Sequence, residues 1–221
     1  MNEKSILIIL GGTWHDFDGF TTVLRPVFED AGYRVTPTYD FDVLTRLGGS
    51  DYDVTLLYTC VGEVRDDPDA KTAPGFSEAQ VTGLLEWVRA GGGLLAAHAA
   101  TVAGQSSPVL KALLGGVFVT HPPQFAFTVY PLYREHPITA GIEAFTVRDE
   151  LYVQAYDATV EIHAVTIDRG VAYPMVWSRC EGQGRVAHVA LGHGPEVWNL
   201  PPYQRLMLQA ANWLSEQRDG E

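Results

Sequence analysis

The stretch SILIILGG, at residues 5–12, gives the first indication of the architecture. An uninterrupted apolar run that ends in paired glycines is typical of a parallel strand buried on both faces. A helix is predicted after it, over residues 20–31, where apolar side chains recur at helical spacing and Gly32 supplies the stop signal. A strand that leads into a helix in this way predicts a parallel sheet covered by helices on both faces.

The alternation of strand and helix continues through the first half of the chain. Further strands are predicted at residues 33–38, 54–59 and 94–97. Pro37 favours an edge position for the first of these, because proline cannot donate a hydrogen bond to a neighbouring strand. Ser77 and Gln80 form a capping-box pattern, so a helix is predicted to begin there and to end at the glycines of residues 91–93. The polar residues 66–74 are predicted to form an exposed loop.

The second half of the chain predicts antiparallel strands as well. Helices are predicted over residues 108–114 and 203–214, and strands at residues 125–130, 162–167, 174–178 and 185–191. The last two strands flank EGQG at residues 181–184, which is a hairpin signal. The predicted fold class is therefore α/β: a doubly wound, mainly parallel sheet with helices on both faces and an additional β-hairpin or antiparallel region in the second half.

Length and composition indicate one globular domain over residues 1–221, because 221 residues can bury one sizeable core. Asp and Glu number 27 and Lys and Arg only 15, which gives a net charge of −12. Nucleic-acid binding needs clustered basic residues, and none are visible, so nucleic acid is not an expected partner. The same deficit argues against anionic membrane surfaces.

Cysteine usage and hydropathy indicate a cytoplasmic location. Cys60 and Cys180 lie far apart and form no CxxC pair, whereas a small secreted chain stapled by disulfides usually carries more cysteines. The apolar run at residues 5–10 is shorter than the core of a signal peptide. No apolar stretch approaches the length of a membrane span.

Reactive side chains follow three of the predicted strands. They are Trp14 and His15 after the first strand, where Gly12 lets the backbone approach a ligand closely, His98 after residues 94–97, and His193 with Glu196 after residues 185–191. Ligands of open parallel α/β sheets bind outside the carboxyl ends of the strands, so we expect these side chains to share one cleft. Each also has a plain structural interpretation: an exposed turn histidine, a packed core histidine, or a glycine-rich loop whose carboxylate faces solvent.

The residue types in these segments suit acid–base chemistry. His193 and Glu196 are near enough in sequence for the carboxylate to orient the imidazole, as a general base or a metal ligand would require. His121 and Glu150 are further candidates. The remaining histidines are expected in a turn (His136) or in strands with structural or surface roles (His163 and His188).

A metal site is the alternative to a metal-free pocket. Catalytic zinc takes three protein ligands plus water, and His98, His121 and His193 would supply such a set. The chain has no HExxH motif and no His-x-His pair that would fix ligand geometry locally. We therefore expect no cofactor, with a divalent metal such as zinc as the alternative.

Seven short motifs occur in order along nearly the whole chain. They are GGTWHDF (11–17), GGGLLAAHAA (91–100), HPITAGI (136–142), DELY (149–152), PMVWSR (174–179), GQGRV (182–186) and LGHGPEVW (191–198). Together they resemble the ThuA-like (trehalose-utilisation) family of the class I glutamine amidotransferase-like superfamily. The resemblance implies a flavodoxin-like fold.

The resemblance does not carry over glutaminase activity. Glutamine amidotransferases need a cysteine on the turn after a strand, activated by His and Glu. The corresponding position here is His98, and neither Cys60 nor Cys180 lies near it in sequence. His193 and Glu196 are similar to the His-x-Glu arm of that superfamily, but stand one residue further apart.

The ThuA-like family is associated with trehalose and related disaccharides, often beside sugar dehydrogenases that make 3-keto sugars. The resemblance therefore implies an enzyme of carbohydrate catabolism that acts on a disaccharide or keto-sugar derivative. The expected catalytic residues are His15, His98, Glu150 and His193. The expected substrate-binding residues are Gly12, Trp14, His121, Tyr152, Trp177, Glu196 and Trp198. Phe125 is a further aromatic candidate beside a sugar ring, although core or rim packing is the plainer role for the tryptophans.

Two other functions stay open at this point. One is a non-catalytic sugar-binding or scaffold protein that kept the fold and lost the nucleophile. The other is a metal-dependent hydrolase. A small-molecule carbohydrate is the expected ligand of the enzyme and of the sugar-binding protein. A homo-oligomer is compatible with all three functions.

Overall fold

The computed structural model describes residues 3–65, 69 and 71–216. Its strands are β1 (Lys4–Gly12), β2 (Tyr33–Thr38), β3 (Val54–Cys60), β4 (Gly93–Ala97), β5 (Gly116–Thr120), β6 (Phe125–Pro131), β7 (Phe145–Asp149), β8 (Val153–Tyr156), β9 (Glu161–Asp168), β10 (Val171–Glu181) and β11 (Gly184–Val189). Its helices are α1 (Phe17–Asp30), α2 (Glu78–Arg89), α3 (Pro108–Leu114), α4 (Pro195–Trp198) and α5 (Pro201–Ser215). Shorter 3₁₀ segments cover Phe41–Gly49, His98–Gln105 and Pro137–Thr139.

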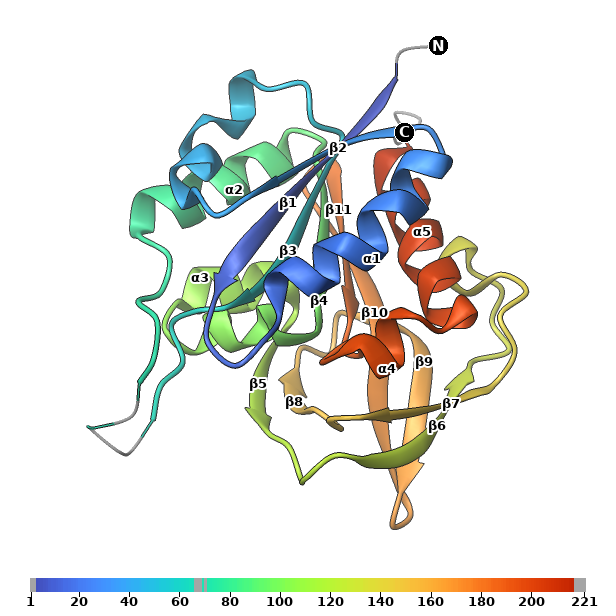
Figure 1. Cartoon of the computed structure of the whole chain (residues 1–221). Helices are drawn as coiled ribbons and strands as arrows, with labels where there is room; N and C mark the ends of the chain where they lie inside the picture. Colours follow the sequence, from blue (N-terminus) through green and yellow to red (C-terminus); the bar gives the residue numbers. More distant parts are fainter. Residues whose placement is uncertain (1–2, 66–68, 70, 217–221) are drawn as a thin grey trace.

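One nine-stranded sheet organises the described residues, in the order β2-β1-β3-β4-β11-β10-β9-β6-β7 (Figure 1). In this order, the first five strands, β2, β1, β3, β4 and β11, are parallel. The last four, β10, β9, β6 and β7, are each antiparallel to the strand before them. The pairing changes at β11, which is parallel to β4 and antiparallel to β10. The predicted α/β class with an added antiparallel region is confirmed.

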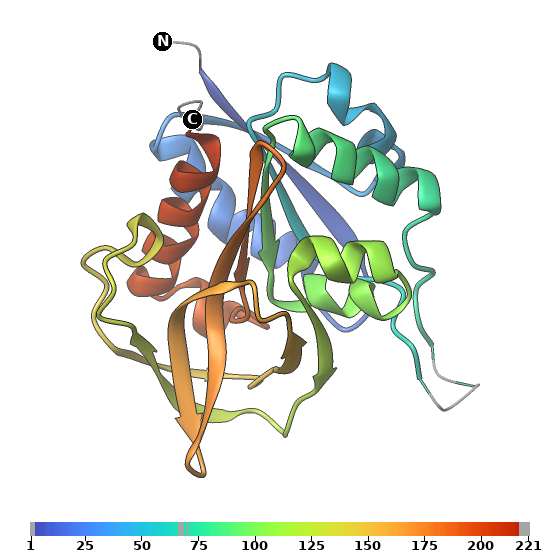
Figure 2. The same ribbon diagram turned by 180° about the vertical axis from the view of Figure 1, so that it is seen from behind.

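Helices cover both faces of the sheet, α1 and α5 on one and α2 and α3 on the other (Figures 1 and 2). Side chains of a strand alternate between faces. Ile6, Ile8 and Leu10 of β1 accordingly pack with the α1 and α5 side, and Leu7 and Ile9 pack with the α2 and α3 side. Because both faces of β1 are covered, its sequence is apolar throughout rather than alternating.

Local signals placed most elements of the first half correctly. β2 is an edge strand, as Pro37 predicted. The capping box at α2 is present: the Gln80 backbone N–H donates to Ser77 Oγ at 3.3 Å, and the Ser77 N–H donates to Gln80 Oε1 at 2.9 Å. The predicted loop at residues 66–74 lies in part outside the described residues, and residues 71–74 belong to neither helix nor strand.

Several elements of the second half were not predicted. β5 and β8 form a separate two-stranded sheet, and β7 adds an edge to the main sheet. These strands have four or five residues and several exposed positions, so they carry no long apolar pattern. They depend on pairing with distant segments. Within the described part of the chain, none of the helices combines the length and apolar character needed to cross a bilayer.

Candidate functional site

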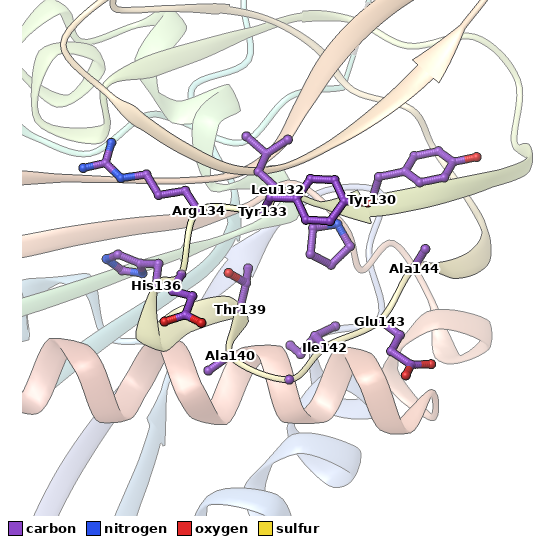
Figure 3. A pocket seen from close by; sticks show the side chains of 13 residues that line it. Tyr130, Leu132, Tyr133, Arg134, His136, Thr139, Ala140, Ile142, Glu143 and Ala144 are labelled. Carbon is purple, nitrogen blue, oxygen red and sulfur yellow. The ribbon is translucent and has the colours of Figure 1, made fainter.

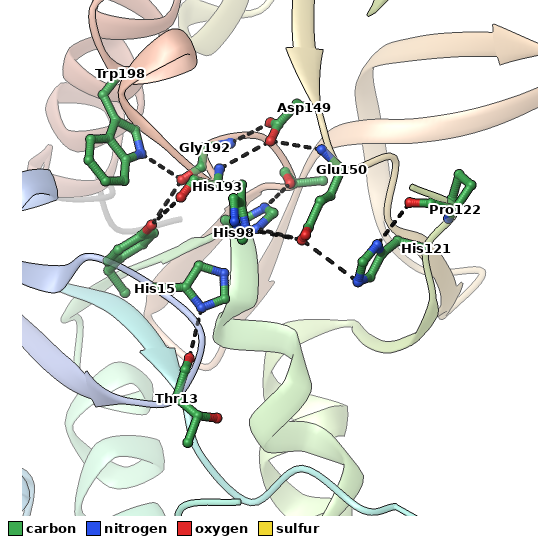
Figure 4. Close-up of polar contacts among 12 residues, drawn as sticks. Thr13, His15, His98, His121, Pro122, Asp149, Glu150, Gly192, His193 and Trp198 are labelled. Carbon is green, nitrogen blue, oxygen red and sulfur yellow. Dashed lines mark hydrogen bonds and ion pairs between the residues drawn. The ribbon is translucent and has the colours of Figure 1, made fainter. Parts of the chain in front are cut away.

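Four reactive side chains converge at the carboxyl edge of the sheet: His15, His98, Glu150 and His193 (Figure 4). His15 follows β1, His98 follows β4, Glu150 follows β7 and His193 follows β11. Ring centroids are 5.1 Å apart for His15 and His98, 4.8 Å for His15 and His193, and 5.5 Å for His98 and His193. The structure thus brings together the four residues expected to be catalytic. We call them the four-residue cluster.

The backbone has unusual conformations in the segment that carries His15 and at His98. Gly12 has a φ of +116°, and a Cβ there would stand 2.0 Å from the carbonyl oxygen of Cys60. Only glycine therefore allows β1 to lie this close to β3, where the Thr13 N–H donates to the same carbonyl at 3.1 Å. Trp14 and His98 also have positive φ, 72° and 44°, which is uncommon outside glycine and clusters at functional sites.

Backbone carbonyls fix the orientation of two imidazole rings. His15 Nδ1 lies 3.0 Å from the carbonyl oxygen of Thr13, and His98 Nδ1 lies 2.9 Å from that of Ala190. A carbonyl oxygen only accepts, so each Nδ1 carries the hydrogen and each neutral ring keeps its lone pair on Nε2. Both Nε2 atoms are buried and have no hydrogen-bond partner among the described residues. Leaving a buried polar atom unpaired costs about 1–3 kcal/mol, so stability alone does not explain this arrangement.

Glu150 supplies the negative charge of the cluster. Its Oε2 lies 3.1 Å from His193 Nδ1 and 3.5 Å from His98 Nε2. Burial opposes ionisation of Glu150, but the contacts with His193 and His98 outweigh it and lower the pKa of the carboxyl well below its usual range. In turn the Glu150 carboxylate raises the pKa of His193. Burial, with His98 nearby, lowers the pKa of His15 to about 3, so that ring is neutral.

Asp149 holds the backbone on which two members of the cluster lie. One of its carboxylate oxygens accepts from the backbone N–H of Gly192 at 2.7 Å. The other accepts from the backbone N–H groups of His193, at 3.1 Å, and of Glu150, at 2.9 Å. Sequence analysis missed this role. The available signal was an acidic residue immediately before the candidate Glu150.

Trp198 also supports the His193 loop rather than facing a ligand. Its indole N–H donates to the Gly192 carbonyl oxygen at 2.6 Å, and the side chain is 1% exposed. Trp177 lies away from the cluster: it is fully buried, donates to the Leu114 carbonyl oxygen at 3.0 Å and packs against His188. The structure therefore places both tryptophans in the core, which was the plainer expectation for them.

Glu196 does not orient His193. Its side chain is 66% exposed, and its nearest charged partner is Arg148, at 3.8 Å. The carboxylate beside His193 is that of Glu150 instead. The pairing expected between Glu196 and His193 from their sequence spacing is therefore wrong, because α4 begins at Pro195 and turns Glu196 outward.

His121 and Tyr152 line the edge of the cluster. Tyr152 is buried with its ring centroid 4.2 Å from that of His98, and His121 stacks on Tyr152 at 5.6 Å. His121 Nδ1 lies 2.9 Å from the Pro122 carbonyl oxygen, so its lone pair is on Nε2, which is 3.8 Å from Glu150 Oε2. Phe125 packs against Phe127, further along the same chain segment.

An aromatic surface stands beside His15. Trp14 is 57% exposed, yet its indole N–H donates to Glu63 Oε2 at 3.1 Å, and the Arg65 guanidinium lies 5.1 Å from the centre of its ring. Glu63 and Arg65 also pair with each other at 2.7 Å. Trp14 is thus an exposed aromatic ring held in place by its neighbours.

Two groups of described residues place metal-ligand atoms within 4.8 Å of one another. The first is the four-residue cluster. The second, which we call the lower cluster, comprises His136, Glu161 and His163. His121 belongs to neither group, although sequence analysis had placed it with His98 and His193 as a ligand set.

Comparison with known proteins agrees with the motifs. A family model for ThuA, described as trehalose utilisation, matches residues 6–214. The chain belongs to the ThuA family. The expected membership is thereby confirmed, and no curated protein matches this ThuA chain in sequence.

Solved structures show the same fold. A ThuA-like protein from Parabacteroides merdae is 20% identical, with a TM-score of 0.78 over 97% of this chain and 90% of that one. A cytoplasmic protein of Salmonella typhimurium LT2 is 14% identical, with a TM-score of 0.71 over 95% and 99%. A β-galactosidase from Rahnella sp. R3 contains a similar unit: it is 14% identical, with a TM-score of 0.64 over 98% of this chain but only 32% of the enzyme.

Proposed function

We propose that this ThuA chain is an enzyme of carbohydrate catabolism that acts on a disaccharide or keto-sugar derivative at the four-residue cluster. The observation that carries the proposal is the convergence of four reactive side chains from four separate segments. They meet where open α/β sheets bind their ligands. The substrate class follows from the family, whose described role is trehalose utilisation, and trehalose is a disaccharide.

The cluster has the groups needed to move a proton beside a sugar carbonyl or glycosidic oxygen. The Glu150 carboxylate stays ionised, and its negative charge stabilises the protonated form of His193. The raised pKa of His193 makes that ring the readiest proton donor of the cluster, while neutral rings such as His15 present lone pairs. A carboxylate and imidazoles whose pKa values are pushed apart suit an acid–base pair.

The exposed ring of Trp14 supports a carbohydrate ligand. It lies one residue from His15 and is held by Glu63 and Arg65, so little side-chain entropy is lost when a ligand packs on it. The apolar face of a sugar ring can pack on such a surface, and the carboxylate and guanidinium at its rim can bond to hydroxyl groups.

The main rival is a non-catalytic sugar-binding or scaffold protein. Unpartnered lone pairs on the buried His15 and His98 argue against a scaffold, which gains nothing from them, whereas a sugar-binding protein would use them to accept from hydroxyl groups. Thiol chemistry of the glutaminase type is not proposed. His98 occupies the turn after β4, and burial raises the pKa of the Cys60 thiol to about 11, which keeps it protonated. Both cysteines are free, which fits the cytoplasmic location that we include in the proposal.

A turnover screen tests the proposal. Purified protein is incubated with trehalose, maltose, sucrose and their 3-keto forms, and products are followed by NMR. We expect turnover of at least one compound, its loss in His193→Ala, and unchanged turnover in His136→Ala, which alters a histidine outside the four-residue cluster. Full activity in His193→Ala would show that the reaction centre is elsewhere, and no turnover across the panel would favour the binding or scaffold role.

A further inference from the structure

The four-residue cluster contains acceptor atoms that face one another with no donor between them. His15 Nε2 and His98 Nε2 are buried and lack hydrogen-bond partners among the described residues, and the buried His193 Nδ1 lies 3.1 Å from Glu150 Oε2. The Thr13 and Ala190 carbonyls fix the hydrogens of the first two rings on Nδ1, away from the cluster. The fourth member, Glu150, brings a carboxylate. Such a set repels itself unless a cation lies among its members.

In the part of the chain that the structure describes, no ion pair joins Glu150 to a lysine or an arginine. Every ion-pair contact of Glu150 within the described ranges is with a histidine: His98, His121 or His193. The neighbouring Arg148 points to Glu196, and Arg65 pairs with Glu63.

We infer that His15, His98, His193 and Glu150 together bind one divalent transition-metal ion. Neutral imidazole and carboxylate are the ligand types that Zn²⁺, Mn²⁺ and Fe²⁺ take in proteins. Adjacent ligands on bonds of about 2.0–2.2 Å stand roughly 3.0–3.5 Å apart. Glu150 Oε2 lies 3.1 Å from His193 Nδ1 and 3.5 Å from His98 Nε2, so these atoms already stand at the separation of neighbouring ligands.

The surroundings of the ligands match those of a metal centre. Metal-binding histidines almost always donate their second N–H to a carbonyl or carboxylate, which fixes the ring and raises its basicity. Thr13 and Ala190 provide those carbonyls. Asp149 binds the backbone N–H groups of Glu150 and His193, so it positions two of the four ligands at once.

This inference concerns the same residues as the proposed function, and rests on it for the reaction that the metal serves. It replaces the expectation of a metal-free pocket. The imidazoles then hold the ion, and the ion takes over the polarisation of a substrate oxygen. His121 remains as a group for proton transfer, because its Nε2 faces Glu150 from outside the ligand set. An ion that takes more than four ligands, such as Mn²⁺, keeps positions open for substrate oxygens.

Metal binding is tested on the untagged full-length protein. The protein is treated with a chelator, dialysed, and titrated with Zn²⁺, Mn²⁺ or Co²⁺, and bound metal is measured by elemental analysis. We expect one ion per chain for at least one of the three. Bound Co²⁺ should give visible absorption from nitrogen and oxygen ligands. His15→Ala should weaken binding by more than about 100-fold, beyond what loss of an outer hydrogen-bond partner costs.

Matched variants separate the ligand set from its neighbours. His121→Ala and His136→Ala remove histidines beside and away from the set, and both should keep one ion per chain. Circular dichroism shows whether each variant is folded. If His15→Ala does not fold, His193→Ala replaces it in the binding measurement, because His193 lies in a partly exposed loop. Absence of stoichiometric binding by the folded wild-type chain, or equal binding by the folded His15→Ala or His193→Ala chain, overturns the inference. Turnover by metal-free protein would support the proposed function and contradict the metal site. Metal binding without turnover would support the metal site and contradict the proposed function.

Discussion

The four-residue cluster and the lower cluster contain the same residue types and differ in what surrounds them. In the lower cluster, the Ile138 N–H donates to His136 Nδ1 at 3.2 Å, and Arg134 Nε lies 3.1 Å from Glu161. His163 Nε2 is 2.7 Å from Ser178 Oγ. Figure 3 shows Arg134 and His136 on one side of a pocket formed by the end of β6 and the segment after it.

The difference lies in the source of positive charge. Glu161 has a guanidinium beside it, so its negative charge is balanced by the protein itself, although His163 Nδ1 is buried without a hydrogen-bond partner among the described residues. The rings of His136 and His163 also stack on each other, with centroids 3.9 Å apart and planes inclined by 22°. The three rings of the four-residue cluster do not stack, and their planes are inclined to one another by 61° to 77°. Proximity of histidines and a glutamate therefore does not by itself indicate a metal site.

The largest expected effect comes from matched changes of the two glutamates. Glu150→Gln keeps the shape of the side chain and removes the charge that balances three imidazoles. We expect turnover to fall by at least about 10²–10⁴-fold, the range that a proton-transfer group contributes. Glu161→Gln makes the same chemical change in the lower cluster and should leave turnover unchanged. Steady-state kinetics of the two variants on one substrate make the comparison, and equal losses in both would mean that the two clusters are not functionally distinct.

A smaller effect is expected for His121, beside the four-residue cluster. His121→Gln keeps a polar side chain at the end of β5 but removes the titratable ring that faces Glu150. We expect kcat to fall by about 10²-fold, at the lower end of the range for acid–base groups, with bound metal unchanged. Parallel measurement of kcat, KM and metal content checks this. Loss of the metal along with activity would instead make His121 a ligand, as sequence analysis had it.

The smallest expected effect is on stability at acid pH and concerns the lower cluster. Burial, with His136 and Arg134 nearby, lowers the pKa of His163 to about 3. Its unfolded value is near 6.5, so between pH 6.5 and 3 the unfolded chain binds a proton that the folded chain does not. Stability is therefore lost as pH falls through this window, by at most about 1.4 kcal/mol per pH unit for this one group.

His163→Gln should flatten that dependence. The comparison is the difference in unfolding free energy between wild type and variant, measured by urea denaturation at several pH values between 4 and 8, because other buried histidines titrate in the same range. The difference should shrink as pH falls. A constant difference across the range would show that His163 titrates normally in the folded chain.

How much of this could be predicted from the sequence depends on how local the signal was. β1, α2 and the hairpin of β10 and β11 carry their own patterns: a buried apolar run, a capping box and a glycine turn. His15, His98 and His193 were found because each follows a parallel strand, and parallel strands share a carboxyl edge.

Features that depend on contacts between distant segments could not be predicted from the sequence. Glu150 was a candidate without a partner, since β7 was not predicted and nothing local shows that its end faces β4 and β11. Glu196 was paired with His193 by spacing alone, whereas a short helix turns it outward. The role of Asp149 depends on backbone N–H groups 43 and 44 residues away. Tautomers set by carbonyl oxygens are likewise properties of the folded chain.

The position of β11 has a consequence for synthesis of the protein. This strand is made after every other strand of the described sheet, yet it lies in the middle, between β4 and β10. A chain still emerging from the ribosome therefore presents β4 as an open edge until about ninety further residues have been added. His193 arrives a few residues later, so a nascent or truncated chain has neither a closed sheet nor a complete cluster. Any chaperone that protects this chain would be needed most while β4 waits for its neighbour.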